Sequence, residues 1–133
     1  MNVGDTIPPW ALPLTPTTIV STAIATRDWQ DVHHDRDVAQ AAGSKDIFMN
    51  ILTTNGFVQR FVTDWAGQDA RIRRVAIRLG APNFVGDAMR LTGTVAGLDR
   101  QARTADIAVS GRNAIGEHVA ATVTIGFAEG GRG

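Results

Sequence analysis

The stretch Ile47–Trp65, IFMNILTTNGFVQRFVTDW, decides what kind of fold this chain can form. Its apolar residues recur at helical spacing, which predicts one long amphipathic helix that begins near Ser44 or Asp46. Gly67 is positioned to end that helix. Gly56 lies in its middle, where glycine costs about 1 kcal/mol relative to alanine, and this indicates close packing against a sheet. The recurring apolar residues are Ile47, Ile51, Val58, Phe61, Val62 and Trp65.

The second half of the chain alternates between apolar and polar residues with a period of two, which is typical of strands with one buried face. Ala70–Leu79 is a further, less regular strand, and Leu98–Gln101 and Asn113–Gly116 are expected to form hairpin turns. One long helix followed by these strands predicts an α+β fold, in which an antiparallel sheet wraps around the helix. The alternating residues are Met89, Leu91, Gly93 and Val95, then Ala105, Ile107 and Val109, then Val119, Ala121, Val123, Ile125 and Phe127.

The segments that precede the long helix are less uniform. Pro8–Pro16 is too rich in proline for a central strand and is expected to be an irregular arm or an edge piece. Thr17–Thr26 is rich in threonine and β-branched residues and predicts a strand covered on both sides. Asp35–Ala42 is predicted to be a short helix broken by Gly43. The tail Glu129–Gly133 is expected to be frayed.

Composition limits the class of protein. A length of 133 residues predicts one domain over residues 1–133, and 44% hydrophobic against 20% charged residues is an ordinary globular balance. No apolar run is long enough to span a membrane, the first residues do not resemble a signal peptide, and there is no cysteine, so we expect a cytoplasmic protein. Thirteen basic and thirteen acidic residues cancel, so no nucleic-acid partner is expected.

Acid, amide and imidazole groups gather in Arg27-Asp28-Trp29-Gln30-Asp31-Val32-His33, which is followed by Ala39. Taken alone, an aspartate five residues before a histidine leaves two interpretations open. Asp28 and His33 could form a catalytic pair, or Asp28 could cap the helix near Asp35 while His33 is an ordinary surface residue.

The loop resembles the motif of the MaoC-like (R)-specific enoyl-CoA hydratases, Gly-Asp-x-Asn-Pro-aliphatic-His-x5-Ala/Ser. Asp28 and His33 match its two catalytic positions, and Val32 and Ala39 match its aliphatic and small residues. The departures are Arg27 for glycine, Gln30 for asparagine and Asp31 for proline. The wider run 19–67, with Val-His-His-Asp-Arg-Asp and Gly-Ser-Lys-Asp-Ile-Phe-Met-Asn-Ile-Leu, resembles the small subunits of heteromeric actinobacterial hydratases that act on steroid side chains.

This resemblance implies the hot-dog fold, an acyl-CoA thioester as substrate, and a site shared between two hot-dog units. The partner would be a second MaoC-like subunit in a heteromer, or another copy in a homodimer. No cofactor is implied, since coenzyme A is part of the substrate. The cluster Arg71, Arg73, Arg74 and Arg78 is then either a solvated strand edge or a contact for the phosphates of coenzyme A.

The reaction that the resemblance implies is addition of water to the 2,3 double bond of an enoyl thioester. It needs a base, a proton donor and stabilisation of the charge on the thioester oxygen. By resemblance Asp28 and His33 share the proton transfers, with the division between them open, and the Asn50 and Ile51 amides stabilise the oxygen. Trp29 is a candidate apolar wall that would raise the pKa of Asp28. The expected substrate-binding residues are Trp29, Gln30, Asn50, Ile51 and Phe57, with Phe61 as a further acyl contact.

The remaining polar residues are expected to be structural. His34 is predicted to point away from the pair, and His118 to lie on the polar side of the last strand. Asp31, Asp35 and Asp37 fit no zinc or calcium pattern, so no metal site is expected.

Two other functions stay open at this stage. A hot-dog acyl-CoA thioesterase would also activate water with an acid, although such enzymes usually lack the Asp-x4-His pair. A non-catalytic subunit that completes a binding tunnel is favoured by Met49-Asn50, where many relatives have His-Gly.

Overall fold

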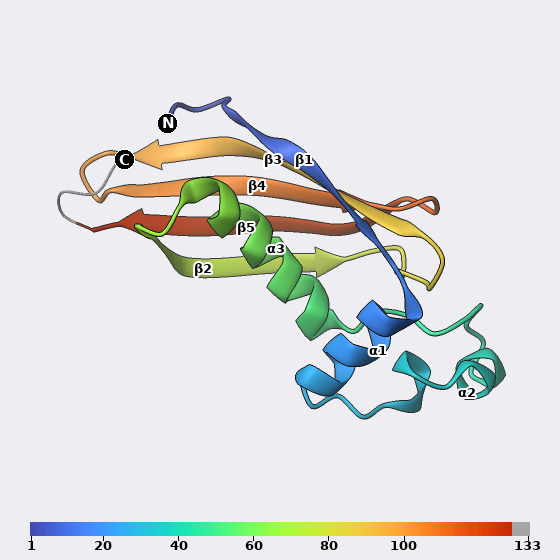
Figure 1. Ribbon diagram of the computed structural model, residues 1–133. Coiled ribbons are helices and arrows are strands. Elements are labelled where there is room, and N and C mark those ends of the chain that lie inside the picture. Colours follow the sequence, from blue (N-terminus) through green and yellow to red (C-terminus); the bar gives the residue numbers. More distant parts are fainter. Residues whose placement is uncertain (129–133) are drawn as a thin grey trace.

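The computed structural model describes residues 1–128, so the expected frayed tail 129–133 lies outside them. A five-stranded sheet in the order β1-β3-β4-β5-β2 crosses the molecule, and every neighbouring pair is antiparallel. Helix α3 lies across one face, and the shorter helices gather near its first turn (Figure 1). The strands are β1 (Thr6–Pro13), β2 (Ala70–Leu79), β3 (Ala88–Asp99), β4 (Thr104–Arg112) and β5 (Glu117–Phe127).

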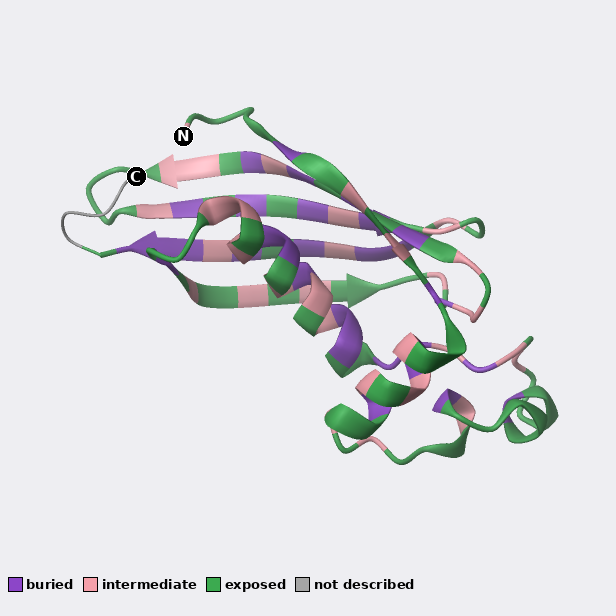
Figure 2. Ribbon diagram, viewed as in Figure 1, coloured by how far each residue is buried: buried purple, intermediate pink, exposed green. Residues whose placement is uncertain are grey.

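The core lies between α3 and the sheet, as the two periodicities predict. Val58, Phe61 and Val62 of α3 (Ile51–Ala66) are buried. The apolar positions of β3, β4 and β5 are buried in alternation, which Figure 2 shows as alternating bands of buried and more exposed residues along these strands. This is the hot-dog arrangement, and the predicted α+β class is confirmed.

Helix α3 ends where predicted but starts later. Gly67 follows the last turn with φ of 89°, in the left-handed region that favours glycine. The helix begins after Asn50, whose side chain accepts a hydrogen bond from the Thr53 amide, so the start predicted near Ser44 or Asp46 is wrong. Residues 47–49 are extended instead because they pair with residues 83–85 of another loop.

The strand predicted for the segment after the prolines is wrong, because this segment forms α1 (Pro16–Ala25). Thr15 caps the helix by accepting from the Thr18 amide, and Pro16 occupies the first turn, where its missing N–H costs nothing. Ile19 and Ala23, four residues apart, form its buried face. The segment resembles a strand in composition because it is rich in threonine and β-branched residues, but its buried residues have helical spacing.

The sheet has two different edges. β1 is an edge strand, as its prolines predict, and its pairing with β3 is interrupted between Ile7 and Trp10, where Pro8 and Pro9 lie. β2 forms the other edge and pairs only with β5 among the described strands. The four arginines of β2 are exposed. Its sequence carries no proline, so its free backbone groups remain available to a further strand.

Three smaller expectations have mixed outcomes. The short helix is confirmed as α2 (Arg36–Ala41), capped by Asp35. Close packing at Gly56 is wrong, since a Cβ built there would meet no atom within 4 Å. His118 is 3% exposed rather than superficial, because its ring turns into the core and bonds the Thr54 hydroxyl and the Ala81 carbonyl. Within residues 1–128 no helix is long and apolar enough to cross a membrane.

Candidate active site

A tight turn at the end of α1 brings Asp28 to the site. The Asp28 amide donates to the Ala23 carbonyl and the Arg27 amide to the Ile24 carbonyl, each at 2.9 Å, which is the Schellman pattern of helix termination. Arg27 adopts a left-handed φ of 57°. This position favours glycine, the residue that the hydratase motif has there, so Arg27 retains the turn with some backbone strain.

His33 ends the short 3-10 helix η1 (Asp31–His33) and is held from the other side by Phe48. Its Nδ1 lies 2.7 Å from the Phe48 carbonyl oxygen, and the two rings meet edge to face with centroids 5.0 Å apart. A carbonyl can only accept, so Nδ1 carries a proton. In the neutral ring the lone pair is therefore on Nε2.

The Nε2 side of the ring faces Asp28. His33 Nε2 lies 3.3 Å from Asp28 Oδ2, and the two side chains are 7% and 20% exposed. The sequence interpretation in which Asp28 caps the following helix and His33 is superficial is wrong, since Asp35 provides that cap. The pair is thus mostly enclosed, yet still reachable by a water molecule.

Asn50 joins Asp28 to the start of α3. Its Nδ2 donates to Asp28 Oδ2 at 3.1 Å and to Thr26 Oγ1 at 2.8 Å, and Asn50 itself is buried. The backbone N–H of Gln30 donates to the other carboxylate oxygen, Asp28 Oδ1, at 3.3 Å. The Asn50 hydrogen bond, with smaller contributions from Gln30 and His33, holds the pKa of Asp28 below its ordinary value and outweighs the opposing effect of burial. The predicted rise in pKa is wrong.

The first turn of α3 supplies unpaired amides beside this network. Ile51 and Leu52 open the helix, where their N–H groups have no acceptor inside it. The positive end of the helix dipole lies at the same point. An oxyanion bound here would be stabilised next to the Asp28 and His33 side chains.

The expected substrate-binding residues divide into two groups. Asn50 and Ile51 lie at the start of α3, and Phe57 is half-buried one to two turns later, edge to face with Trp10 at 5.7 Å. Gln30 is exposed and reaches Asp28 only through its backbone. Trp29 is 65% exposed, so it forms no apolar wall around Asp28 within this chain.

The remaining histidines have other roles. His34 is exposed and faces Asp31, with 3.5 Å between Nε2 and Oδ1, which agrees with its predicted orientation away from the pair. His118 is connected to the site through Thr54. The Thr54 hydroxyl oxygen lies 2.8 Å from His118 Nε2 and 3.4 Å from the Asn50 carbonyl oxygen. Burial lowers the pKa of His118, with an opposing effect from the Ala81 carbonyl. Nothing in the strand pattern distinguishes it from a surface histidine.

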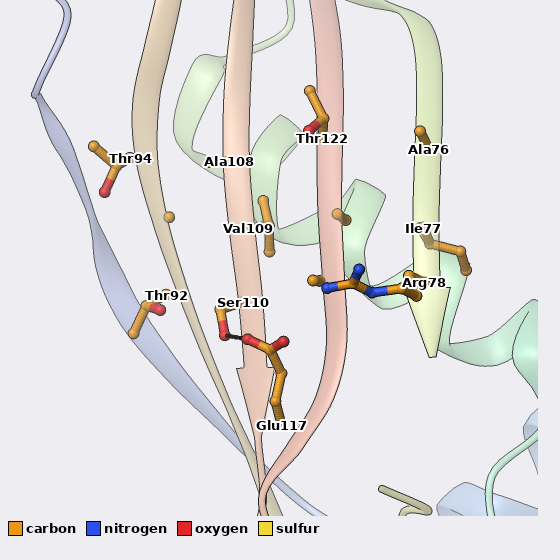
Figure 3. A pocket seen from close by; sticks show the side chains of 13 residues that line it. Ala76, Ile77, Arg78, Thr92, Thr94, Ala108, Val109, Ser110, Glu117 and Thr122 are labelled. Atoms are coloured by element: carbon orange, nitrogen blue, oxygen red, sulfur yellow. Dashed lines mark hydrogen bonds between the residues drawn. The ribbon is translucent and has the colours of Figure 1, made fainter. Parts of the chain in front are cut away.

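Two hollows differ in their relation to the pair. A groove of about 230 Å³ between α1 and α3 includes Thr26, which bonds Asn50. A shallow hollow of about 560 Å³ lies on the sheet face turned away from α3 (Figure 3). It is lined mainly by alanine, threonine and serine, and its Ser110 hydroxyl donates to Glu117. This second hollow is far from the catalytic candidates in the fold. In residues 1–128 no group of three histidine or acidic side chains could hold a metal ion.

Relief of the strained turn gives the first prediction. Replacing Arg27 by glycine should raise the free energy of unfolding by roughly 1 kcal/mol, because glycine adopts the left-handed conformation without a Cβ clash. Urea denaturation measures the change. Arg100→Gly is the matched control at an exposed turn residue without a positive φ, and it should give no gain. Equal effects of both substitutions would contradict the assignment of strain to Arg27.

The Asn50 contact gives the second prediction. Asn50→Ser keeps an oxygen that caps α3 but removes the donor to Asp28, so the pKa of Asp28 should rise. A carboxyl-carbon NMR titration measures it. In the original chain, the lowered pKa means that ionised Asp28 contributes stability above the ordinary value of 3.8, and this contribution is lost as the pH falls through the lowered value. An unchanged titration would show that Asn50 does not control this carboxylate.

Comparison with known proteins agrees with this architecture. The chain is 53% identical over 123 residues to the 3-oxo-4,17-pregnadiene-20-carboxyl-CoA hydratase beta subunit of Mycobacterium tuberculosis, covering 92% of this chain and 94% of that protein. A chain in the crystal structure of the ChsH1-ChsH2 complex from the same species superposes with a TM-score of 0.93 at 50% identity, over 96% of this chain and 99% of the other. An (R)-hydratase from A. caviae involved in PHA biosynthesis shares the fold, with a TM-score of 0.85 at 15% identity and coverage of 96% and 98%.

The family model described as the MaoC like domain matches residues 4–117. That range contains the Asp28 and His33 loop, all of α3 and the first four strands. This protein therefore belongs to the MaoC-like domain family.

Proposed function

We propose that this chain is a hydratase subunit that adds water across the 2,3 double bond of a 2-enoyl-CoA thioester. The observation that carries the proposal is the 3.3 Å approach of His33 Nε2 to Asp28 Oδ2, with Nδ1 committed to the Phe48 carbonyl. This gives one free basic nitrogen and one carboxylate oxygen that can bind the same water molecule. The unpaired amides of α3 begin beside them.

In the proposed reaction His33 is the base. Nε2 takes a proton from water, and the hydroxide oxygen bonds to C3 of the enoyl group while the double-bond electrons move towards the thioester oxygen. Asp28 stays ionised, since the Asn50 donor lowers its pKa, and it stabilises the imidazolium that forms. The proton on Nε2 then passes to C2, so the water is fully consumed and the pair returns to its first state.

Charge on the thioester oxygen is stabilised by the start of α3. The amides of Asn50 and Ile51 are the proposed donors, where the helix dipole also favours negative charge. The Asn50 side chain turns towards Asp28 and Thr26.

The proposed substrate is a bulky enoyl-CoA of the steroid side-chain type, and the proposed partner is a second MaoC-like subunit. Both are supported by the relative named a steroid carboxyl-CoA hydratase beta subunit and by the similar chain crystallised in a two-protein complex. Apolar side chains exposed at this end of the molecule, Ile24, Trp29, Ile51 and Leu52, are suited to contact substrate or partner. The free edge of β2 is suited to pair with the partner's sheet. Coenzyme A belongs to the substrate, and the reaction as written uses no separate cofactor.

The test is turnover of a steroid enoyl-CoA by the chain mixed with its MaoC-like partner. Asp28→Asn and His33→Gln should each lower kcat by about 10²-fold or more, since general acid–base groups contribute about 10²–10⁴. Asp31→Asn and His34→Gln are matched controls, because they change the same residue types in an exposed pair of the same loop, and they should change kcat by less than about twofold.

Three results would contradict the proposal. Full activity in both Asp28→Asn and His33→Gln would exclude the pair from the chemistry. Release of free coenzyme A from saturated thioesters, without hydration, would indicate a thioesterase. Equal hydration by the partner alone would indicate that this chain is a structural subunit.

A further inference from the structure

His118 is a buried histidine that a β-bulge turns towards the core. Val119 pairs with Gly111 of β4, but Glu117 pairs with the very next residue, Arg112, so His118 is an extra residue without a partner in β4. His118 and Val119 are both buried, although neighbouring residues of a regular strand point to opposite faces. A bulge re-aims a side chain in this way. The backbone of β5 is therefore shaped to bring this imidazole inside.

The loop after β2 packs closely against the bulge. The Gly80 amide donates to the His118 carbonyl at 2.7 Å. A Cβ added to Gly80 would collide with the Glu117 carbonyl oxygen, so only glycine permits this approach. The same loop continues to Asn83, whose carbonyl accepts from the Met49 amide just before α3. The bulge and the segment that leads into α3 are thus held by one loop.

Both ring nitrogens of His118 are hydrogen-bonded. Nδ1 lies 2.6 Å from the Ala81 carbonyl oxygen, which can only accept, so Nδ1 carries a proton. Burial lowers the pKa of His118 against the opposing effect of the Ala81 carbonyl, so the ring is neutral at neutral pH. In the neutral ring Nε2 accepts, and the Thr54 hydroxyl at 2.8 Å is its donor. The imidazole therefore joins the loop after β2 to the beginning of α3.

Thr54 carries this restraint to the peptide group that opens α3. Its amide donates to the Asn50 carbonyl at 3.2 Å and closes the first turn. That carbonyl and the Ile51 N–H belong to one planar peptide group. The Ile51 N–H has no acceptor inside the helix, and its direction follows from the position of Thr54. His118 fixes that position from the sheet.

We propose that His118 is a positioning residue, which acts through Thr54 to aim the Ile51 N–H at the thioester oxygen of the substrate. The inference rests on the proposed hydratase function and extends it to a residue outside the reacting pair. His118 takes no part in the proton transfers, because both of its nitrogens are already bonded. An apolar side chain would fill the same space without needing two polar partners, so the role explains why a histidine is buried there.

The test removes the bond between His118 and Thr54 from each side, in the complex of this chain with its MaoC-like partner. Thr54→Val keeps the shape of the side chain without its hydroxyl, and His118→Asn keeps a donor for the Ala81 carbonyl but loses Nε2. Each should lower kcat for a steroid enoyl-CoA by about tenfold, less than the 10²–10³ typical of outright loss of an oxyanion donor. The double variant should lose no more than either single variant, because both remove one interaction.

Thr53→Val is the matched control. It removes a buried hydroxyl from the same turn of α3, but this hydroxyl has no hydrogen-bond partner among residues 1–128. The substitution should therefore change kcat by less than about twofold, since no bond to the start of the helix is lost.

A second measurement separates positioning from a general loss of stability. Butyryl-CoA with carbon-13 at its carbonyl is a thioester without a double bond to hydrate, so it reports binding alone. In the original complex and in Thr53→Val, infrared spectroscopy should show its carbonyl stretch below that of free butyryl-CoA, because N–H donors polarise the bound oxygen. In Thr54→Val and His118→Asn this shift should fall to less than about half.

Each outcome decides a separate point. Lower kcat together with a smaller carbonyl shift supports the positioning role. Original kcat with a full shift in both variants would overturn it while the hydratase proposal stands, and so would a change in only one of the two readouts. Thr54→Val leaves His118 in place, so it decides the question by itself if His118→Asn does not assemble. Absence of hydration by the original complex would overturn the proposed function, while the carbonyl shift would still decide whether His118 positions the donor.

Discussion

The hydrogen bond between the Phe48 carbonyl and His33 Nδ1 is the contact on which the site depends. At 2.7 Å it joins the end of η1 to the segment that leads into α3, fifteen residues further along the chain. Phe48 is itself fixed, because it bridges to Phe84 and the neighbouring Met49 amide donates to the Asn83 carbonyl. Since a carbonyl only accepts, the bond determines the tautomer of the ring as well as its orientation. The free nitrogen is then the one that faces Asp28, and acid–base chemistry becomes available on that side only.

Asn50 couples the fold to the ionisation of the site. One amide side chain caps α3 through its oxygen and restrains Thr26 and Asp28 through its nitrogen. The end of α1 and the start of α3 are thereby held at a fixed separation, and the carboxylate between them is kept in its charged form. This arrangement suits a site that needs a carboxylate anion beside an imidazole base, because Asn50 favours the charged form of Asp28.

Much of the fold could be predicted from the sequence, because periodicity reports directly which faces are buried. The strands β3, β4 and β5 and the end of α3 at Gly67 follow from local spacing. Helix α1 could not be separated from a strand by composition, since its threonines and isoleucines fit both, and what distinguishes the helix is the four-residue spacing of Ile19 and Ala23 together with the capping by Thr15. Asp28 and His33 were identified through their motif. Asp28 and His33 lie in one loop, whereas the carbonyl of Phe48 and the side chain of Asn50 come from a second segment, and no spacing along the chain encodes how the two segments meet. The burial of His118 has the same origin, since its partners lie in α3 and in the loop after β2.

The central claim is that His33 presents an unprotonated Nε2 to Asp28 when the ring is neutral. Nitrogen-15 NMR of the histidine-labelled chain measures this directly, because protonated and unprotonated ring nitrogens have widely separated chemical shifts. The account predicts that neutral His33 carries its proton on Nδ1 and that its Nε2 is unprotonated. A neutral ring with its proton on Nε2 would contradict the account, since the nitrogen facing Asp28 would then have no lone pair with which to take a proton from water.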